Sequence, residues 1–288
     1  MGYYNGKLIL ITGGSSGIGL ALAKQLAALD ANIWILARNK ERLESALVEI
    51  QASKKDASQK FGIIQADVSD EPNINSALDR FIAEVGVPDI LINSAGVTRP
   101  GLFWELDSEI FRWNMDVNYL GSVYTTKRVI PGMIKRHSGH IINLCSAAGY
   151  VGAYGYTAYC GSKFANFGFS DALRQEVKEF NIRISVVMPP DTNTPQLAGE
   201  APYKPAITKA MSEDNTGVVE PDVVAREIIN SAAKGRFLIL TNFQTKLLYN
   251  VINILRVFNL YLPFMDMLVS QARSKVEKEN KQKASASS

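Results

Sequence analysis

Seven short apolar runs alternate with longer amphipathic segments along most of this chain, and this alternation limits the fold more than any other feature. The runs have the length of buried strands, and the segments between them repeat apolar residues with the period of a helix. A helix between two strands carries the chain back to the starting end of the sheet, so the strands lie parallel and helices cover both faces. The pattern therefore predicts a doubly wound, parallel α/β sheet. Its expected strands are Leu8–Ile11, Ile33–Leu36, Gly62–Gln65, Ile90–Ile92, Ile141–Leu144, Ile184–Val187 and Phe237–Leu240.

The length and composition of the chain suit a single domain. Its 288 residues are 47% hydrophobic and 20% charged, and no internal linker is rich in proline, glycine and serine. We expect one domain over residues 1–243, then an apolar helical extension over residues 244–275 and a disordered, mixed-charge tail over residues 276–288. The expected helices of the domain are Gly19–Leu29, Arg42–Ala52, Ile74–Val85, Ser108–Arg136 and Ala158–Phe180.

A glycine-rich turn from Thr12 to Gly19 connects the first expected strand to the first expected helix. Glycines let a backbone turn sharply and approach a pyrophosphate, which then lies at the positive end of the following helix. Such a turn can also occur without a nucleotide, but a strand before it and a helix after it are the setting that a dinucleotide site requires. The turn predicts a Rossmann-type cofactor site with contacts from Gly13, Ser15, Ser16, Gly17, Ile18 and Gly19.

The residues after the second strand favour NADPH over NADH. Dinucleotide folds that prefer NAD usually place an acidic residue about 20 positions beyond the glycines, where it binds the ribose 2′-hydroxyl. Ala37 holds that place here, Arg38 follows it, and Lys40 and Arg42 are close behind. A planar guanidinium suits a 2′-phosphate, so we expect Arg38 and Arg42 to bind NADPH. The alternative is a solvated, basic start of the next helix.

Polar residues also follow the third and fourth strands. We expect Asp67 and Val68 to contact the adenine end of the cofactor, and Asn93, Ala95 and Gly96 to form the floor of its site. Asp and Asn often cap the helix that follows them, and this second interpretation stays open for both segments.

Ser146, Tyr159 and Lys163 have a spacing that suits carbonyl reduction. Ser146 follows the fifth strand, and the other two stand four residues apart in an expected helix, which places them on one face. A neighbouring ammonium lowers the pKa of a phenol, which is otherwise about 10. Such a tyrosine can donate its proton to a ketone oxygen that a serine hydroxyl stabilises. Tyr3 and Lys7 have the same spacing, but they lead into a strand, where side chains four apart are not helical neighbours.

The net charge, the histidines and the cysteines give no indication of a nucleic-acid-binding, metal-binding or secreted protein. A net charge of +3 gives no nucleic-acid signature. His137 and His140 lack the company of metal ligands, so we assign no metal. Cys145 and Cys160 offer no disulfide framework, and no signal peptide precedes the first strand. We therefore expect a cytoplasmic protein in a reducing compartment.

Taken together, these motifs resemble the short-chain dehydrogenase/reductase superfamily in their order and separation, over about residues 7 to 240. The resemblance implies that Tyr159 is the general acid in a reduction, that Lys163 lowers its pKa and holds the nicotinamide ribose, and that Ser146 positions the carbonyl. It also implies that Asn118 supports a proton relay. That role would explain an amide inside a long helical pattern, because Asn118 would hold a water on the way to Lys163.

Two departures from the superfamily pattern stand out. Ser94 replaces a second asparagine that is common there, which is a mild change. After the sixth strand the usual Pro-Gly is replaced by Pro189-Pro190-Asp191-Thr192, and the second proline makes this turn stiff. We expect Pro189 and Thr192 to complete the cofactor contacts, and the resemblance further implies a homo-oligomer, either a dimer or a tetramer.

The stiff turn is similar to that of the 3-ketodihydrosphingosine (3-dehydrosphinganine) reductases, as are the segments Ala37–Asn39 and Asn118–Tyr124. This narrower resemblance implies NADPH-dependent reduction of a long-chain amino ketone in sphingolipid synthesis. The alternatives are a reductase of another lipophilic ketone, of steroid or 3-ketoacyl type, and a non-catalytic NADPH-binding scaffold. Asp191 either pairs with the substrate ammonium or only forms an N-cap or Asx turn before the segment that starts at Thr194.

The apolar stretch from Leu247 to Val269 follows the expected domain. It is long enough to span a membrane, but polar residues interrupt it at nearly every turn of a helix, among them Asn253 and Arg256. We expect a helical hairpin that covers the substrate pocket; contact with a partner subunit and peripheral membrane contact are the alternatives. Eukaryotic reductases of the similar subfamily commonly carry a membrane segment before the first strand, and none is seen ahead of Lys7 here. If the protein is eukaryotic, the resemblance implies membrane association at the cytosolic face of the endoplasmic reticulum.

Overall fold

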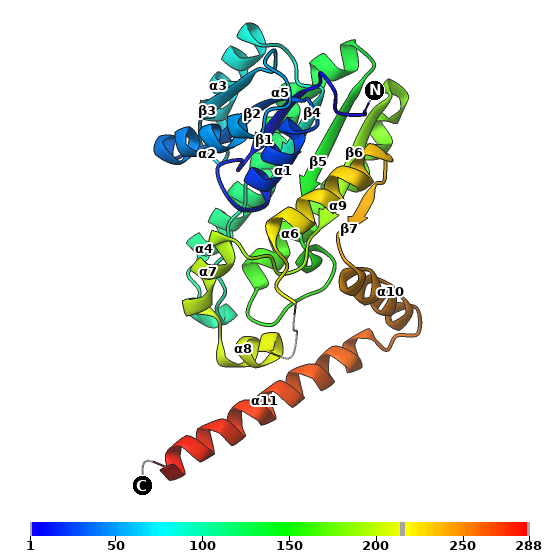
Figure 1. The fold of residues 1–288 in the computed structure, drawn as a ribbon. Coiled ribbons are helices and arrows are strands. Elements are labelled where there is room, and N and C mark those ends of the chain that lie inside the picture. Colours follow the sequence, from blue (N-terminus) through cyan, green and yellow to red (C-terminus); the bar gives the residue numbers. More distant parts are fainter. Residues whose placement is uncertain (1, 214–216, 287–288) are drawn as a thin grey trace.

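The computed structural model describes residues 2–213 and 217–286, and it confirms a parallel, doubly wound sheet of seven strands (Figure 1). The strand order is β3-β2-β1-β4-β5-β6-β7, so the chain starts inside the sheet and winds outward in both directions. Each expected strand is present at its predicted place. The strands are β1 (Leu8–Thr12), β2 (Asn32–Ala37), β3 (Phe61–Gln65), β4 (Ile90–Asn93), β5 (Gly139–Leu144), β6 (Ile182–Met188) and β7 (Leu238–Leu240).

Two hydrophobic cores lie on opposite faces of this sheet. Side chains alternate between the faces along a strand, so Ile9 and Ile11 of β1 pack into one core and Leu10 packs into the other. The first core is closed by α1 (Gly17–Ala27), α2 (Lys40–Ala52) and α9 (Pro221–Ala233). The second is closed by α3 (Glu71–Glu84), α5 (Gly121–Lys135) and α6 (Thr157–Val177).

The long helix expected over Ser108–Arg136 is interrupted near its middle. It consists of α4 (Ser108–Met115), a π-helical turn (Asp116–Leu120) and α5. A π turn holds one more residue than an α turn, and such turns are frequent at functional sites. Asn118, whose presence in a helix required a reason, lies in this turn.

Shorter elements and the C-terminal helices lie below the carboxyl end of the sheet (Figure 1). They include α7 (Pro195–Glu200), α8 (Ala206–Glu213), α10 (Phe243–Val257) and α11 (Tyr261–Ala286), and α11 packs against α8. Single 3₁₀ turns cover Phe103–Glu105, Ala147–Gly149, Lys178–Phe180 and Ala201–Tyr203.

The tail expected to be disordered over residues 276–288 is helical as far as it is described, because α11 continues through Ala286. Residues 287 and 288 lie outside the described residues. The segment is rich in Lys, Glu, Gln and Ala, which are good helix formers. Glu277 and Glu279 each precede a lysine by four residues, an arrangement that stabilises a helix.

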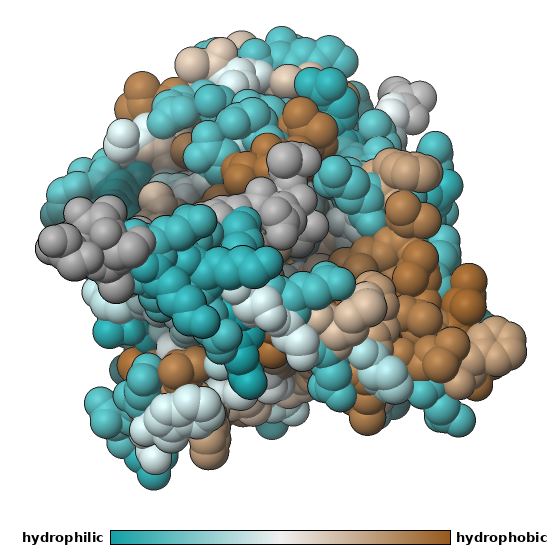
Figure 2. All heavy atoms as spheres, turned by 90° about the horizontal axis from the view of Figure 1, so that it is seen from below, coloured by the Kyte–Doolittle hydropathy of each residue, from teal (hydrophilic) through white to brown (hydrophobic). Residues whose placement is uncertain are grey.

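The C-terminal extension leaves large apolar side chains exposed. Phe243 is 76% exposed, Val257 75% and Leu262 68%. Figure 2 shows apolar side chains gathered at one side of the lower face of the molecule. Within the described part of the chain, no helix combines the length and the apolar character needed to cross a membrane.

Candidate active site

A cavity of about 1070 Å³ opens at the carboxyl ends of the strands, where ligands bind in open α/β sheets. One part of its wall, which we call the cofactor half, follows β1, β2, β3 and β4. The other part, the substrate half, is formed by the segment after β6 together with α10 and α11. The predicted site residues that line the cavity are Gly13, Ser15, Ser16, Gly17, Ile18, Gly19, Arg38, Arg42, Asp67, Val68, Ala95, Gly96, Ser146, Tyr159, Lys163, Pro189 and Thr192.

Asn93 and Asn118 are the two predicted site residues that do not line the cavity. Asn93 is 3% exposed; its amide donates to Asn143 Oδ1 at 2.8 Å and accepts from Thr125 Oγ1 at 2.7 Å. The side chain that was expected on the cofactor floor is therefore turned into the protein, because polar partners on β5 and α5 satisfy it there. It supports the floor from behind.

The glycine-rich turn has the close packing that a pyrophosphate cradle requires. Gly13 has φ of +66°, and a Cβ placed on it would come within 2.8 Å of the Ala95 backbone. A Cβ on Gly19 would collide with the Gly13 carbonyl. Ser16 caps α1 without a side-chain hydrogen bond, so the cap side chain does not satisfy the first backbone N–H groups of α1. The turn thus fits a dinucleotide phosphate by its shape and by its donors.

Arg38 stands at the far end of the cofactor half. Its guanidinium lies 3.6 Å from Asp67 Oδ2, and its side chain is 61% exposed. Partial burial raises the pKa of Asp67, but hydrogen bonds from Ser69 and the charge of Arg38 outweigh it and hold this pKa below its usual value. Asp67 does not cap the next helix, since Asp70 does so by accepting from Asn73 N. Arg38 is therefore held at the cavity by one weak ion pair and keeps most of its donors accessible.

Ser146, Tyr159 and Lys163 come together where β5 meets α6. Lys163 is 4% exposed; its Nζ donates to Leu144 O at 3.1 Å and lies 5.6 Å from the centre of the Tyr159 ring. Ser146 Oγ accepts from Ala148 N at 3.2 Å. Tyr3 and Lys7, the other tyrosine and lysine with this spacing, have a structural role, as the sequence indicated. Lys7 lies over the Tyr3 ring, and Tyr3 Oη hydrogen-bonds His140 Nδ1 at 3.0 Å.

The pKa of Tyr159 differs from the expectation of a lowered value. Burial of the phenol raises this pKa well above its ordinary value, and a hydrogen bond with Ser146 lowers it by less. Burial also lowers the pKa of Lys163. The expected direction is wrong for this structure because burial raises the pKa of the phenol more than the Ser146 hydrogen bond lowers it. A protonated phenol at neutral pH is the form that a proton donor needs.

Asn118 fixes the geometry around Lys163. Its Oδ1 accepts from Val97 N at 2.8 Å, and its Nδ2 donates to Val97 O and to Ser162 Oγ, both at 2.9 Å. A Cβ on Gly96 would lie 3.4 Å from Asn118 Oδ1 and 3.7 Å from Lys163 Nζ, so the two groups face the same small space. The π turn thus joins the loop after β4 to α6. A relay through bound water stays a prediction.

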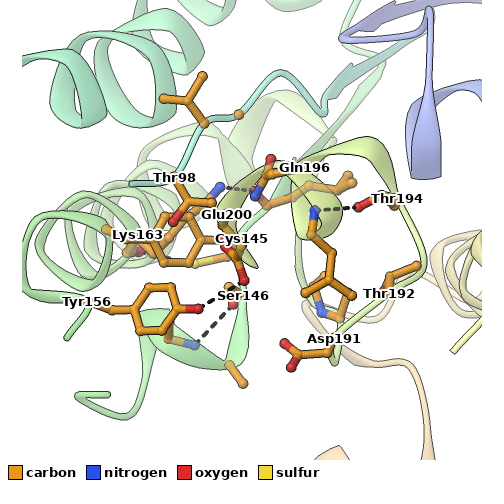
Figure 3. Close-up of a pocket in the computed structure, with 18 of the residues that line it drawn as sticks. Thr98, Cys145, Ser146, Tyr156, Lys163, Asp191, Thr192, Thr194, Gln196 and Glu200 are labelled. Atoms are coloured by element: carbon orange, nitrogen blue, oxygen red, sulfur yellow. Dashed lines mark hydrogen bonds between the residues drawn. The ribbon is translucent and has the colours of Figure 1, made fainter. Parts of the chain in front are cut away.

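Sequence reasoning missed the carboxylate of Glu200, which the fold brings to the substrate half. Tyr156 Oη donates to Glu200 Oε1 at 2.9 Å (Figure 3). Lys204 Nζ lies 3.0 Å from the same oxygen. Burial first, and then the charge of Glu200, raise the pKa of Tyr156. The only sequence signal was that Glu200 stands four positions before a lysine. This spacing is also common on solvent-exposed helices, so it does not indicate a buried carboxylate.

Asp191 does not cap the segment from Thr194. Thr194 itself caps α7, because its hydroxyl accepts from Leu197 N at 3.3 Å (Figure 3). The backbone carbonyl of Asp191 accepts from Val219 N at 2.9 Å, and its side chain is exposed at the cavity. The capping interpretation is therefore wrong.

The C-terminal helices form an apolar wall of the substrate half, and polar residues on α10 attach it to the site. Asn253 hydrogen-bonds the Tyr150 hydroxyl, and Arg256 Nη2 donates to Tyr150 O at 2.5 Å. Tyr150 belongs to the loop after β5 that carries Ser146. These two polar interruptions of the apolar stretch are thus internal contacts. The apolar lining from these helices is Leu248, Ile252, Phe264, Met265, Leu268 and Ala272.

Comparison with known proteins identifies the family and several relatives of this chain. Residues 7–203 match the family described as short chain dehydrogenase. The chain is 40% identical over 234 residues to 3-dehydrosphinganine reductase of Danio rerio, a match that covers 81% of this chain and 70% of the relative. It is 36% identical over 279 residues to 3-ketodihydrosphingosine reductase of Dictyostelium discoideum, covering 92% and 83%.

Solved structures share the fold at lower identity. Levodione reductase superposes with a TM-score of 0.73 at 20% identity, covering 84% of this chain and 99% of the other. A short chain dehydrogenase/reductase from Burkholderia phymatum in complex with NAD superposes with a TM-score of 0.75 at 22% identity, covering 88% and 96%. At these identities the likeness concerns the fold alone.

Proposed function

The chain belongs to the short-chain dehydrogenase family, and from this premise we propose that it reduces 3-ketodihydrosphingosine to dihydrosphingosine with NADPH, in sphingolipid synthesis. One observation carries the proposal. A single continuous cavity joins the glycine-rich turn and Arg38 to Ser146 and Tyr159, and then to the apolar wall of α10 and α11. A nucleotide, a ketone and an alkyl chain each meet a matching surface there.

In this proposal the protein contributes the proton and the orientation. Tyr159 Oη donates a proton to the ketone oxygen, and the phenol holds that proton at neutral pH because its pKa is not below the ordinary value of about 10. Ser146 Oγ donates a hydrogen bond to the same oxygen as negative charge develops on it. Lys163, held by Leu144 O and facing the Tyr159 ring, would bind the nicotinamide ribose. NADPH, when bound, supplies the hydride to the carbonyl carbon.

Binding of the cofactor is proposed for the residues of the cofactor half. The backbone of the glycine-rich turn would hold the pyrophosphate, and Arg38 and Arg42 the 2′-phosphate. Asp67 and Val68 would contact the adenine, and Pro189 and Thr192 the nicotinamide end. The exposed guanidinium of Arg38 supports NADPH over NADH.

The apolar extension supports a lipophilic substrate. Each methylene moved out of water gains about 0.8 kcal/mol, so a long alkyl chain needs a long apolar wall. We propose that α10 and α11 provide this wall. We also propose that the protein is cytoplasmic and that the exposed apolar side chains of these helices contact the surface of a membrane, where a lipophilic substrate resides. Assembly into a homo-oligomer stays a prediction.

The test is an assay of cofactor oxidation with a panel of ketones. We expect NADPH to be oxidised fastest with a long-chain 2-amino-3-ketone, more slowly with short ketones, and slowly with NADH throughout. Equal rates with steroid or 3-ketoacyl substrates would contradict the substrate, and absence of turnover with every ketone would contradict a reductase.

A further inference from the structure

Glu200 is a buried carboxylate in the substrate half that the reduction itself does not use. It is 7% exposed and lines the cavity. Acidic side chains are seldom buried unless charged or polar groups satisfy them, because loss of hydration is costly. Its placement next to the catalytic residues therefore requires a reason.

Both partners of Glu200 bind the same oxygen. Tyr156 Oη and Lys204 Nζ contact Oε1, at 2.9 and 3.0 Å. A carboxylate offers about four lone-pair positions over its two oxygens. In the part of the chain that the structure describes, no hydrogen bond or ion pair to Oε2 is found. One oxygen is thus anchored to the protein, and the other keeps its full capacity to accept.

Tyr156 places this carboxylate close to the proton donor. The rings of Tyr156 and Tyr159 lie 6.1 Å apart, and Glu200 binds the hydroxyl of the first (Figure 3). After burial and the Ser146 hydrogen bond, the charge of Glu200 is among the causes that set the pKa of Tyr159. Glu200 therefore acts on the space in front of the catalytic phenol.

We propose that Glu200, through Oε2, binds the ammonium group of an α-amino ketone and so makes that substrate preferred over ketones without the amino group. The inference rests on the proposed function. In such a substrate the amino group is carried by the carbon next to the carbonyl, so it lies beside Tyr159 when the ketone oxygen is bound there. An ammonium is the donor that a half-satisfied carboxylate accepts best.

The other carboxylate of the substrate half is less suited to this role. Asp191 lines the same cavity, but its side chain is exposed, whereas Glu200 is buried. Attraction between charges is several-fold stronger near a protein interior than in water. Asp191 therefore serves as a matched control that carries the same charge at the same cavity.

The experiment measures kcat/KM for a long-chain 2-amino-3-ketone and for the same ketone without the amino group. The ratio of the two is determined for the wild type, Glu200→Gln and Asp191→Asn. Glutamine keeps an oxygen for Tyr156 and removes the charge. We expect Glu200→Gln to lower the ratio by about 10- to 150-fold, the range for a hydrogen bond to a charged group, while turnover of the ketone without the amino group persists. Asp191→Asn should keep the wild-type ratio.

Each other outcome has a defined meaning. A wild type that does not prefer the amino ketone contradicts the proposed function, whereas a preference that survives in Glu200→Gln overturns the role of Glu200 alone. Equal loss on both ketones indicates a purely structural carboxylate and also overturns it. Lys204→Met gives a second test if Glu200→Gln does not fold. It removes the competing cation, so the ratio should stay or rise, and a fall would contradict the inference.

Discussion

The two halves of the cavity are built in different ways. The cofactor half is made of backbone at the ends of neighbouring parallel strands, where Gly13 approaches Ala95 so closely that no side chain fits between them. The substrate half is made of side chains from short helices and from the C-terminal extension, joined by contacts such as Tyr156 with Glu200. The first half follows from strand order, and the second follows from packing between distant segments. Variants in the two halves should therefore change different kinetic constants.

The largest expected effect is at the border between the halves. Tyr159→Phe removes the transferable proton and keeps the ring, so turnover should fall by about 10²–10⁴-fold, the usual contribution of a general acid. NADPH binding, followed by fluorescence titration, should persist. Tyr156→Phe is the matched control, since it removes a hydroxyl one turn away and should keep most turnover of a ketone without an amino group. Similar losses in both variants would show that Tyr159 is not the proton donor.

A charge reversal in the cofactor half should change cofactor choice and little else. Arg38→Asp would remove the proposed charged contact with the 2′-phosphate, for which about 1.5–3 kcal/mol is typical, so the ratio of NADPH to NADH affinity should fall by about 10- to 150-fold. Lys40→Asp makes the same change on a side chain that pairs with Glu44 and lies outside the cavity lining. An affinity ratio that falls equally in both variants would indicate only a general effect of charge.

Shortening an apolar side chain in the substrate half should raise KM for long substrates alone. Leu268 lines the cavity from α11, whereas its neighbour Met267 is 46% exposed and lies outside that lining. At about 0.8 kcal/mol for each methylene contact, loss of two such contacts in Leu268→Ala should raise KM for a long-chain ketone by roughly tenfold. KM for a short ketone should hardly change in this variant. In Met267→Ala, KM should hardly change for either the long-chain or the short ketone. An unaltered KM for the long chain in Leu268→Ala would remove α11 from the substrate wall.

The smallest expected signal is spectroscopic. In the protein without ligands, the difference in phenolate absorbance between wild type and Tyr159→Phe reports the titration of Tyr159. Because burial raises this pKa, the difference should appear only above pH of about 10, the ordinary value for tyrosine. A phenolate that forms below that pH would show that the charge of Lys163 outweighs burial.

The fold and the cofactor half could be predicted because their signals are local in the sequence. The period of the apolar residues placed all seven strands, and a glycine-rich turn between a strand and a helix has few other uses. Ser146, Tyr159 and Lys163 were found in the same way, since one helical turn relates the last two.

The substrate half could not be predicted because its contacts join distant residues. Glu200 meets Tyr156 across 44 positions, and Asn253 meets Tyr150 across 103, so neither pair leaves a pattern in the sequence. The interruption of the helix at Asn118 and the direction of the Tyr159 pKa also depend on what surrounds these side chains in space. For α11, the propensity of Lys, Glu and Ala outweighed a composition that suggested disorder.

The central claim is that one cavity brings hydride and ketone together, and isotope transfer tests it most directly. The enzyme is incubated with a long-chain 2-amino-3-ketone and NADPH in which both hydrogens on the transferring carbon of the nicotinamide are deuterium, and the product is analysed by mass spectrometry. The account predicts one deuterium per product molecule, located on C3, and none in the product formed with unlabelled NADPH. A reduced product without the label at C3 would contradict it.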